Sequence, residues 1–369
     1  MTADWSHWGR SRPPTQLVHL DSAAAGRTSY AVQRAIAEHL RRESQVGAYV
    51  AAAQAAPAIE AGRADLAALL GVPVAGLAFV ESASAGLAAL LAAWPLPAEA
   101  TIGVAASEWG PNLRAFRDRG LGVRLLPVDS AGRMDVPGLA ALLAADPPTV
   151  VHVLAAAAHR GLVQPLAEIL RVARAAGVPV WVDAAQGLGQ VDVAAGVDAV
   201  YGTSRKWLCG PRGVGLLGVA EEWWGRLRVS PSPLEPEAGP VARLESGDAN
   251  IAGRVGLAVA VAEHVAAGPA AVRRRLASVG ELARAELASA PGWRIVPAVA
   301  PSGASVALRP VAGQDVFAER QRLLESHRVL VTASSPARAP GEDVGPTLRV
   351  SPHVDATAGD FRRLAAALG

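Results

Sequence analysis

The sequence has one cysteine, Cys209, in 369 residues, and its eight histidines are scattered along the chain. A single cysteine excludes a disulfide within the chain and a CxxC metal motif. No HExxH motif and no close histidine pair at ligand spacing is present either. We therefore predict no metal site.

Long apolar runs are also missing. The longest candidate, GLAALLAAWPLPAEA (86–100), is broken by prolines before it reaches the roughly 20 apolar residues of a membrane-spanning helix. The first residues, MTADWSHWGRSRPPTQ, lack the apolar core of a secretory signal. We predict no membrane partner and expect the protein to stay in the cytoplasm.

A concentrated charge of one sign is absent as well. The net charge is +2, and the arginines are spread over several expected helices instead of forming one basic stripe. Proteins that bind nucleic acids usually carry a clustered basic face. We therefore predict no nucleic-acid partner.

What the sequence does contain, from about residue 17 to 220, is a regular alternation of apolar runs and alanine-rich segments of helical period. Strands separated by helices require crossover connections, so the sheet should be mostly parallel and the fold class α/β. Helices are predicted between the strands, for example at 83–94 and 165–177. Strands are predicted at 77–80, 101–106, 123–128, 149–154, 178–183, 198–203 and 213–219.

The length indicates two domains, because a single core rarely grows beyond about 250 to 300 residues. The composition changes at VSPSPLEPEAGPV (229–241), which we interpret as a linker or an active-site loop. Two helical stretches follow it, and then the short strands WRIVP, ASVALRP, HRVLVTA and TLRVSP. We expect an N-terminal arm at 1–16, a large domain at 17–240 and a smaller α+β domain at 241–369.

Polar residues follow the predicted strands where ligands bind in open α/β sheets, beyond the carboxyl ends. VPVWVDAAQG ends a strand at Asp183, with Gln186 three residues later, and DAVYGTSRK ends the next strand at Thr203 and continues to Arg205 and Lys206. Upstream, FVESASAG ends a strand in small hydroxyl residues that open a helix, whose free N–H groups favour a phosphate.

A lysine, a strand-end acid and a phosphate cradle together match the needs of pyridoxal 5'-phosphate. Its aldehyde binds a lysine, its ring nitrogen needs an acid to stay protonated, and its phosphate needs a helix N-terminus. Taken singly, a lysine is usually a surface charge and a strand-end aspartate is usually a turn or capping residue. Their order along the chain favours the cofactor.

The same order resembles the class V aminotransferase family of fold-type I pyridoxal-phosphate enzymes, over most of the chain. LDSAAAG (20–26) is similar to the family's L-D-N-A-A opening, Asp183 and Gln186 fall on its D-x-x-Q motif, and TSRK falls on S-x-H-K. The resemblance implies that Lys206 is the lysine that holds the cofactor. It also implies that Asp183 pairs with the ring nitrogen and that Gln186 pairs with the ring hydroxyl.

Further roles follow from the resemblance. VESASAG is similar to the family's phosphate turn, which implies phosphate contacts from Ala83 and Ser84, with Thr203 as another phosphate ligand. Arg205 replaces the usual histidine of S-x-H-K. TLRVSPH resembles the C-terminal segment whose arginine binds the substrate carboxylate, which nominates Arg349.

The sequence also departs from the family's pattern. Trp109 stands where relatives carry a histidine that stacks on the ring, and an indole can stack equally well. The usual asparagine aligns with Ala158, and the neighbouring His159 can partly replace it. Asp248 occupies the place of a threonine that reaches the partner subunit's phosphate, in a family that implies a homodimer. Tyr49, in the glycine-flanked GAY, is a candidate for contact with the distal end of the substrate.

A cysteine desulfurase would need a cysteine shortly before Arg349, and VLVTASSPARAPGEDVG (329–345) has none. The stretches AHRGLVQPL, GTSRKWLCGPRGVG and LRVSPH resemble the carbon–sulfur lyases of ergothioneine biosynthesis, which act on hercynylcysteine sulfoxide. This implies an amino-acid substrate and a β-elimination that yields ergothioneine, pyruvate and ammonia, with Lys206 taking the Cα proton. An aminotransferase or epimerase using the same residues, and a regulator that only binds the cofactor, stay open as alternatives.

Overall fold

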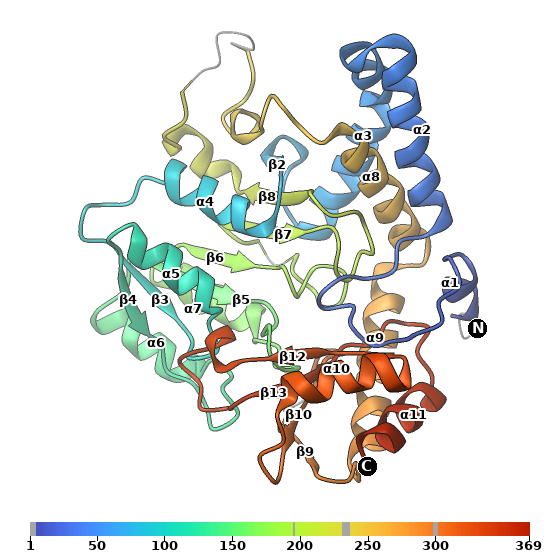
Figure 1. The fold of residues 1–369 in the computed structure, drawn as a ribbon. Coiled ribbons are helices and arrows are strands. Elements are labelled where there is room, and N and C mark those ends of the chain that lie inside the picture. The colour runs from blue at the N-terminus through green and yellow to red at the C-terminus, as the bar shows by residue number, and fades with distance from the viewer. Residues whose placement is uncertain (1–4, 195, 231–236, 298–301) are drawn as a thin grey trace.

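The computed structural model describes residues 5–194, 196–230, 237–297 and 302–369. Its largest element is a seven-stranded sheet in the order β2-β8-β7-β6-β5-β3-β4 (Figure 1). The strands are β2 (Leu77–Val80), β3 (Thr101–Val104), β4 (Gly122–Leu125), β5 (Val150–Leu154), β6 (Val180–Asp183), β7 (Ala199–Thr203) and β8 (Gly215–Val219). Each coincides with a predicted strand to within a few residues.

The sheet is parallel from β4 through β3, β5 and β6 to β7, which confirms the predicted fold class. The exception is β8, which pairs antiparallel with both β7 and β2. No helix intervenes between Thr203 and Gly215, so the chain makes no crossover and returns as a hairpin. The connection of this hairpin, residues 204–214, therefore lies at the carboxyl edge of the parallel strands.

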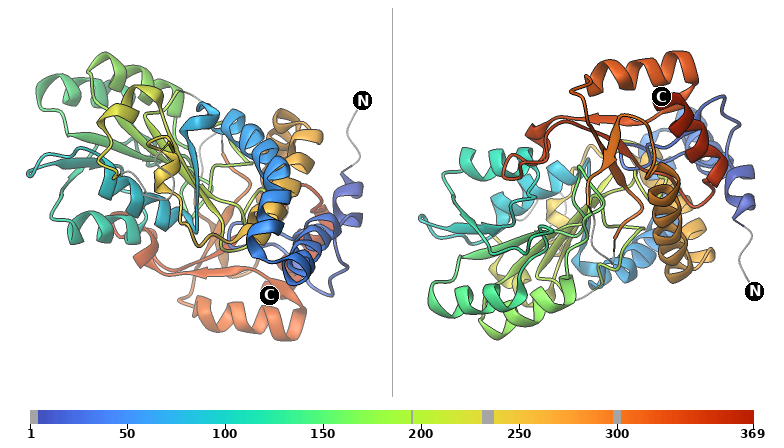
Figure 2. Two further views of the ribbon diagram at one scale, coloured as in Figure 1. Left: turned by 90° about the horizontal axis from the view of Figure 1, so that it is seen from above. Right: turned by 90° about the horizontal axis from the view of Figure 1, so that it is seen from below.

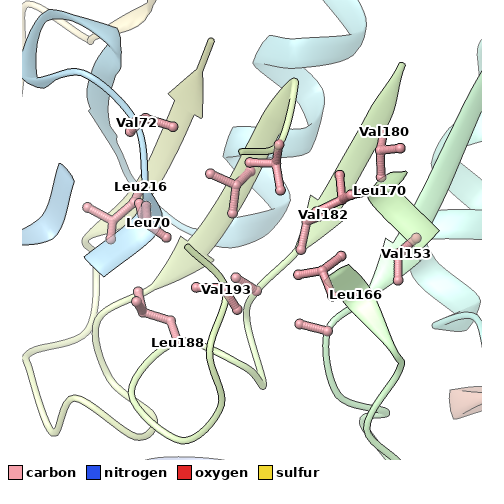
Figure 3. Close-up of a cluster of buried hydrophobic side chains, with 14 of the residues drawn as sticks. Leu70, Val72, Val153, Leu166, Leu170, Val180, Val182, Leu188, Val193 and Leu216 are labelled. Atoms are coloured by element: carbon pink, nitrogen blue, oxygen red, sulfur yellow. The ribbon is translucent and has the colours of Figure 1, made fainter. Parts of the chain in front are cut away.

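Helices cover both faces of the sheet. On one face, α3, α6, α7 and α8 enclose the largest apolar core, where Val180 and Val182 of β6 lie against Leu166 and Leu170 of α7 (Figure 3). On the other face, α4 and α5 enclose a second core. The helices concerned are α3 (Ala48–Leu70), α4 (Ala83–Ala93), α5 (Gly110–Asp118), α6 (Val136–Ala145), α7 (Leu166–Ala175) and α8 (Ile251–Ala266).

The C-terminal part forms a smaller antiparallel sheet in the order β12-β13-β10-β9. It encloses its own apolar core with three helices. The elements are α9 (Pro269–Leu287), β9 (Trp293–Ile295), β10 (Val306–Pro310), α10 (Val316–His327), β12 (Thr332–Ser334), β13 (Thr347–Val350) and α11 (Ala358–Leu368). In Figures 1 and 2 these elements, in orange and red, lie together on one side of the larger sheet.

The two ends of the chain meet in this smaller part. The strand β1 (Val18–His19) pairs in parallel with β11 (Val329–Leu330). The sequence did not predict β1, and it predicted HRVLVTA as one strand. The structure divides that stretch, because β11 pairs with β1 whereas β12 pairs with β13.

The helix α8 packs between the helices α2 (Tyr30–Val46) and α3, which lie beside it in Figures 1 and 2. The remaining helix, α1 (Ser6–Arg10), belongs to the proposed N-terminal arm. The division at 16/17 and 240/241 stays a prediction. Of the proline-rich segment 229–241, residues 231–236 lie outside the described residues, as do residues 1–4 of the arm.

Among the described residues, no single helix is long and apolar enough to span a membrane. Only α8 and α9 taken together meet that criterion, and they are bent by 82° relative to each other.

Candidate active site

A cavity of about 380 Å³ lies at the carboxyl edge of the large sheet. It brings together residues from the ends of β5, β6 and β7, from the first turns of α4 and α5, and from the C-terminal part of the chain. The predicted site residues that line it are Ala83, Ser84, Trp109, Asp183, Gln186, Thr203, Arg205, Lys206 and Arg349.

Two predicted residues do not line this cavity. Tyr49 is on α3 with 91% of its surface exposed. His159 is buried and its Nε2 lies 2.7 Å from Oε2 of Glu342, beside a separate small cavity. Within one copy of the chain, neither side chain reaches the space that Lys206 faces.

One end of the cavity is formed by the start of α4. Ser82 caps this helix, because its Oγ accepts a hydrogen bond from the backbone N of Ala85 at 3.1 Å. The N–H groups of Ala83 and Ser84 begin the helix and have no partner within it. The strand β8 approaches very closely here, since a Cβ on Gly215 would lie 2.4 Å from the backbone of Ser82. Only glycine allows this approach, which fixes the helix start against the sheet.

Lys206 projects into the cavity from the hairpin connection between β7 and β8. It is the only lysine in the sequence, a signal that the motif analysis did not use. The pKa of Lys206 is lowered from 10.5 to about 7, mainly by burial and also by Arg205, Arg349 and Arg338, against the opposing effect of Asp183. A substantial share of Lys206 is therefore a neutral amine near pH 7.

The loop that carries Lys206 is held by the opening segment LDSAAAG. The backbone N of Gly26 donates a hydrogen bond to the carbonyl of Arg205 at 2.7 Å. A Cβ on Gly26 would lie 2.4 Å from the carbonyl oxygen of Lys206, so a larger residue would displace the loop. Within the loop, Cys209 is buried, and burial raises the pKa of its thiol to about 11. Cys209 lines a different cavity and is not a thiolate at neutral pH.

Asp183 ends β6 and is only 5% exposed. Its Oδ1 accepts a hydrogen bond from the backbone N of Ala185 at 2.8 Å, and its Oδ2 accepts one from Nδ2 of Asn112 at 3.0 Å. These donors satisfy part of the buried carboxylate. Asn112 lines the cavity from α5 and was not predicted.

A buried chain of polar side chains continues from Asp183 behind the cavity. Burial, and after it the nearby Asp183, raise the pKa of Tyr201. Nε2 of His152 lies 2.8 Å from the Tyr201 hydroxyl, and Nδ1 of His152 lies 2.8 Å from Oε2 of Glu108. Burial lowers the pKa of His152, but the neighbouring carboxylate of Glu108, through its charge and its hydrogen bond, has the larger opposite effect, so the pKa is raised overall. Glu108 therefore occupies one ring nitrogen of His152 and the Tyr201 hydroxyl occupies the other, so neither buried nitrogen lacks a partner.

This chain of side chains was not predicted from the sequence. A signal was present, because His152 and Tyr201 are polar residues inside the apolar runs TVVHVL and DAVYGT. Both are almost completely buried in the structure, as is Glu108. A buried polar residue in a central strand needs a partner, so the pair pointed to a network.

Gln186 faces the cavity with its amide partly engaged. Its Oε1 accepts a hydrogen bond from Nε1 of Trp207 at 3.1 Å, and its Nε2 donates to the carbonyl of Ala23 at 3.0 Å. An amide nitrogen carries two donors, so one N–H remains for a ligand.

Arg349 is on β13, 1% exposed, and faces the cavity from the C-terminal part. Its Nη1 donates to the carbonyl of Ala158 at 2.6 Å, and its Nη2 lies 3.3 Å from Oδ1 of Asp21. Burial lowers the pKa of Arg349 to about 10 against the opposing effect of Asp21, so the guanidinium stays charged at neutral pH. Its Nε has no hydrogen-bond partner among the described residues.

The family model "Aminotransferase class-V" matches residues 18–364, and the chain belongs to this family. It is 46% identical, over 98% of its length and 92% of the relative's, to a protein of Mycobacterium tuberculosis named "Probable hercynylcysteine sulfoxide lyase". It is also 32% identical, over 69% of each chain, to an isopenicillin N epimerase of Amycolatopsis lactamdurans.

Among solved structures, a cysteine desulfurase of Escherichia coli matches with a TM-score of 0.84 at 23% identity, over 100% of this chain and 98% of that one. At this identity the likeness shows the shared fold, which is the fold-type I architecture predicted from the sequence.

The family membership confirms pyridoxal 5'-phosphate as the cofactor, and the cavity fits it. The helix start at Ala83 and Ser84 offers N–H groups to a phosphate, and two cations, Arg205 and Arg212, line the cavity with no ion-pair partner among the described residues. Lys206 supplies a neutral amine for the aldehyde. The described residues contain no cluster of three or more histidine, cysteine or acidic side chains suited to a metal ion.

Proposed function

We propose that the protein is a pyridoxal-phosphate-dependent carbon–sulfur lyase that eliminates a sulfur leaving group from hercynylcysteine sulfoxide, a cysteine-conjugate sulfoxide. The observation that carries this proposal is the 46% identity to a probable hercynylcysteine sulfoxide lyase over nearly the whole of both chains. The cavity supports it with one carboxylate, Asp183, among five cationic side chains that can bind an anionic cofactor and substrate.

Residues on three sides of the cavity would hold the cofactor. Asp183 would pair with the ring nitrogen, and the free N–H of Gln186 would be available to the ring hydroxyl. Trp109, at the start of α5, would offer an aromatic face to the ring. Ala83 and Ser84 at the start of α4, with Thr203 and Arg205 from the same cavity wall, would bind the phosphate. When bound, pyridoxal phosphate supplies the electron sink that makes the Cα–H bond of an amino acid acidic.

Lys206 serves twice, first as the amine that binds the cofactor and then as the base that takes the Cα proton. A pKa of about 7 suits both tasks, because the amine is available near neutral pH and can still accept a proton. In the elimination the Cα–H and Cβ–S bonds break, a Cα=Cβ bond forms, and the sulfur leaves with an electron pair as a sulfenate. The remaining three-carbon unit hydrolyses to pyruvate and ammonia.

The product that this elimination releases is more oxidised than the thiol expected from the sequence. A sulfoxide that loses its cysteinyl part gives a sulfenic acid, whereas ergothioneine is a thiol, two electrons more reduced. An external thiol must supply those electrons after the elimination.

Arg349 binds the substrate's α-carboxylate in this proposal. Arg349 lies on the cavity wall, and its Nε has no partner in the described part of the chain, so this N–H of the guanidinium is available to a carboxylate. Ala158 and Asp21 hold Nη1 and Nη2 in place. His159 and Tyr49 remain proposals with different requirements. His159 would have to act through Glu342. Tyr49 can reach the substrate only in an assembly of several copies, which is consistent with the homodimer that we also propose. We further propose a cytoplasmic location.

The direct test supplies purified enzyme with hercynylcysteine sulfoxide and measures pyruvate release with lactate dehydrogenase. Stoichiometric pyruvate and ammonia support the lyase. Transfer of the amino group to a keto acid without pyruvate release favours an aminotransferase, and inversion at Cα favours an epimerase. Absence of all three reactions with cofactor bound favours the regulator.

A further inference from the structure

Arg338 is a cation of the cavity wall that the proposed function has not yet used. It ends the short helix η4 (Pro336–Arg338), in the segment between β12 and β13, and lines the same cavity as Lys206. Its guanidinium has no hydrogen-bond or ion-pair partner among the described residues, whereas Arg349 is held by Asp21 and Ala158. A half-buried guanidinium with open donors is suited to an anionic or strongly dipolar oxygen of a ligand.

The segment that carries Arg338 is fixed against the large sheet. A Cβ on Gly110 would lie 2.1 Å from the carbonyl oxygen of Ala337, and a Cβ on Gly341 would lie 2.6 Å from that of Ala106. Glycine at both places lets the two backbones touch. Glu342 then anchors the far side by accepting hydrogen bonds from His159, at 2.7 Å, and from Arg160. The guanidinium is thus presented by a packed segment and not by a free loop.

Two anions of the bound state, the cofactor's phosphate and the substrate's α-carboxylate, already have proposed partners. We assign the cofactor's phosphate to the start of α4 and to Arg205 and Arg212. These two arginines are close together, because Arg212 lowers the pKa of Arg205. We assign the substrate's α-carboxylate to Arg349. Arg338 lies near Arg349 and Lys206, since it lowers the pKa of both. A further oxygen on the substrate, beyond the α-carboxylate, is the group that remains for it.

We infer that Arg338 is a specificity-determining residue that donates hydrogen bonds to the oxygen on the substrate's sulfur. This inference rests on the proposed function. As the Cβ–S bond breaks and the electron pair moves to sulfur, negative charge grows on that oxygen, so a fixed cation beside it favours the sulfenate as the leaving group. A cysteine thioether has no such oxygen and gains nothing from Arg338.

The test compares the wild type with Arg338→Ala, and with Arg309→Ala as the matched control, because Arg309 is an exposed arginine on β10 in the same part of the chain. Pyruvate release is measured from hercynylcysteine sulfoxide, from S-methylcysteine sulfoxide and from β-chloroalanine, whose leaving group is chloride. We expect Arg338→Ala to lower kcat/KM for both sulfoxides about 10- to 100-fold, the range of a lost hydrogen bond to a charged group. Turnover of β-chloroalanine should fall far less, because Arg338 affects this substrate only through the pKa of Lys206, and the remaining turnover also shows that the variant is folded.

A binding measurement gives a second readout. In a Lys206→Ala background, which cannot turn over, calorimetry compares a cysteine-conjugate sulfoxide with the thioether of the same conjugate. Arg338 should account for the tighter binding of the sulfoxide, and the preference should disappear in the double variant Lys206→Ala/Arg338→Ala. Arg338→Lys should keep part of it, because the charge remains and the fork is lost.

Each contrary outcome has a distinct meaning. Equal losses on sulfoxides and β-chloroalanine overturn the inference and place Arg338 on the α-carboxylate. A loss confined to hercynylcysteine sulfoxide, with S-methylcysteine sulfoxide unaffected, overturns it in favour of a contact between Arg338 and the second carboxylate, which only the hercynyl part of the substrate carries. A wild-type enzyme that eliminates from β-chloroalanine but from no sulfoxide overturns the proposed function itself.

Discussion

The ionisation of Lys206 gives the sharpest physical prediction. Its pKa is lowered from 10.5 to about 7, first by burial and then by Arg205, Arg349 and Arg338. At pH 7 about half of the side chain is then neutral, compared with roughly 0.0003 of an ordinary lysine, which is about a thousandfold difference in reactive amine. Because the pKa of this cationic group is lowered, its neutral form is present above about pH 7 and is lost as the pH falls through that value.

The assay is trace acetylation of the cofactor-free protein across pH, with the peptide that contains Lys206 quantified by mass spectrometry. Since Lys206 is the only lysine, the α-amine is the only other amino group to separate from it. The denatured protein serves as the internal reference for an ordinary lysine. The cofactor-free form is required because the phosphate's negative charge would raise the pKa.

Two substitutions set the direction of the expected changes. Asp183→Asn removes the one charge that raises the pKa of Lys206, so the midpoint should fall below that of the wild type. Arg205→Gln removes a cation and should raise it. Because burial is the largest cause, both shifts should be smaller than the shift already produced by folding. A midpoint within one unit of the ordinary 10.5 would refute the reasoning.

Three further predictions concern the residues around Lys206. Asp183→Asn should lower kcat far more than cofactor affinity, because an amide cannot hold the ring nitrogen protonated, and near-normal turnover would contradict this. Tyr201→Phe should lower the free energy of unfolding, measured in urea, by about 1–3 kcal/mol, because Nε2 of His152 loses its partner. It should also shift the pH dependence of the cofactor's absorbance, and an unchanged titration would remove Tyr201 from the support of Asp183. Arg349→Lys should raise KM for amino-acid substrates and lower kcat, since lysine lacks the planar fork, and an unchanged KM would argue against carboxylate binding.

The sequence predicted the large sheet well because its strands are short apolar runs bounded by helices, and these patterns are local. The same locality explains why Asp183, Thr203 and Lys206 could be assigned to one cavity. They follow neighbouring parallel strands, whose carboxyl ends share one edge of the sheet. No long-range contact had to be guessed.

The parts that escaped prediction depend on contacts between distant segments. The strand β1 has two residues and exists only because β11 pairs with it. Arg338 looks like a surface arginine in the sequence, and only the close approach of Gly110 and Gly341 to neighbouring backbone places it in the cavity. Tyr49 was chosen for the nearby Gly47, a local feature, and its contact with the substrate stays a prediction that depends on a second copy of the chain.

The charges of the cavity connect binding to catalysis. The cations that lower the pKa of Lys206 are Arg205, Arg349 and Arg338, the same side chains that we assign to the phosphate, the α-carboxylate and the sulfoxide oxygen. Each ligand anion that pairs with one of them cancels part of its repulsion on the lysine, so the proton affinity of Lys206 rises as the site fills. Before substrate binds, the lysine is neutral enough to hold the cofactor. Once the substrate is in place and the amine is released, it is a stronger base at the moment when the Cα proton must be removed.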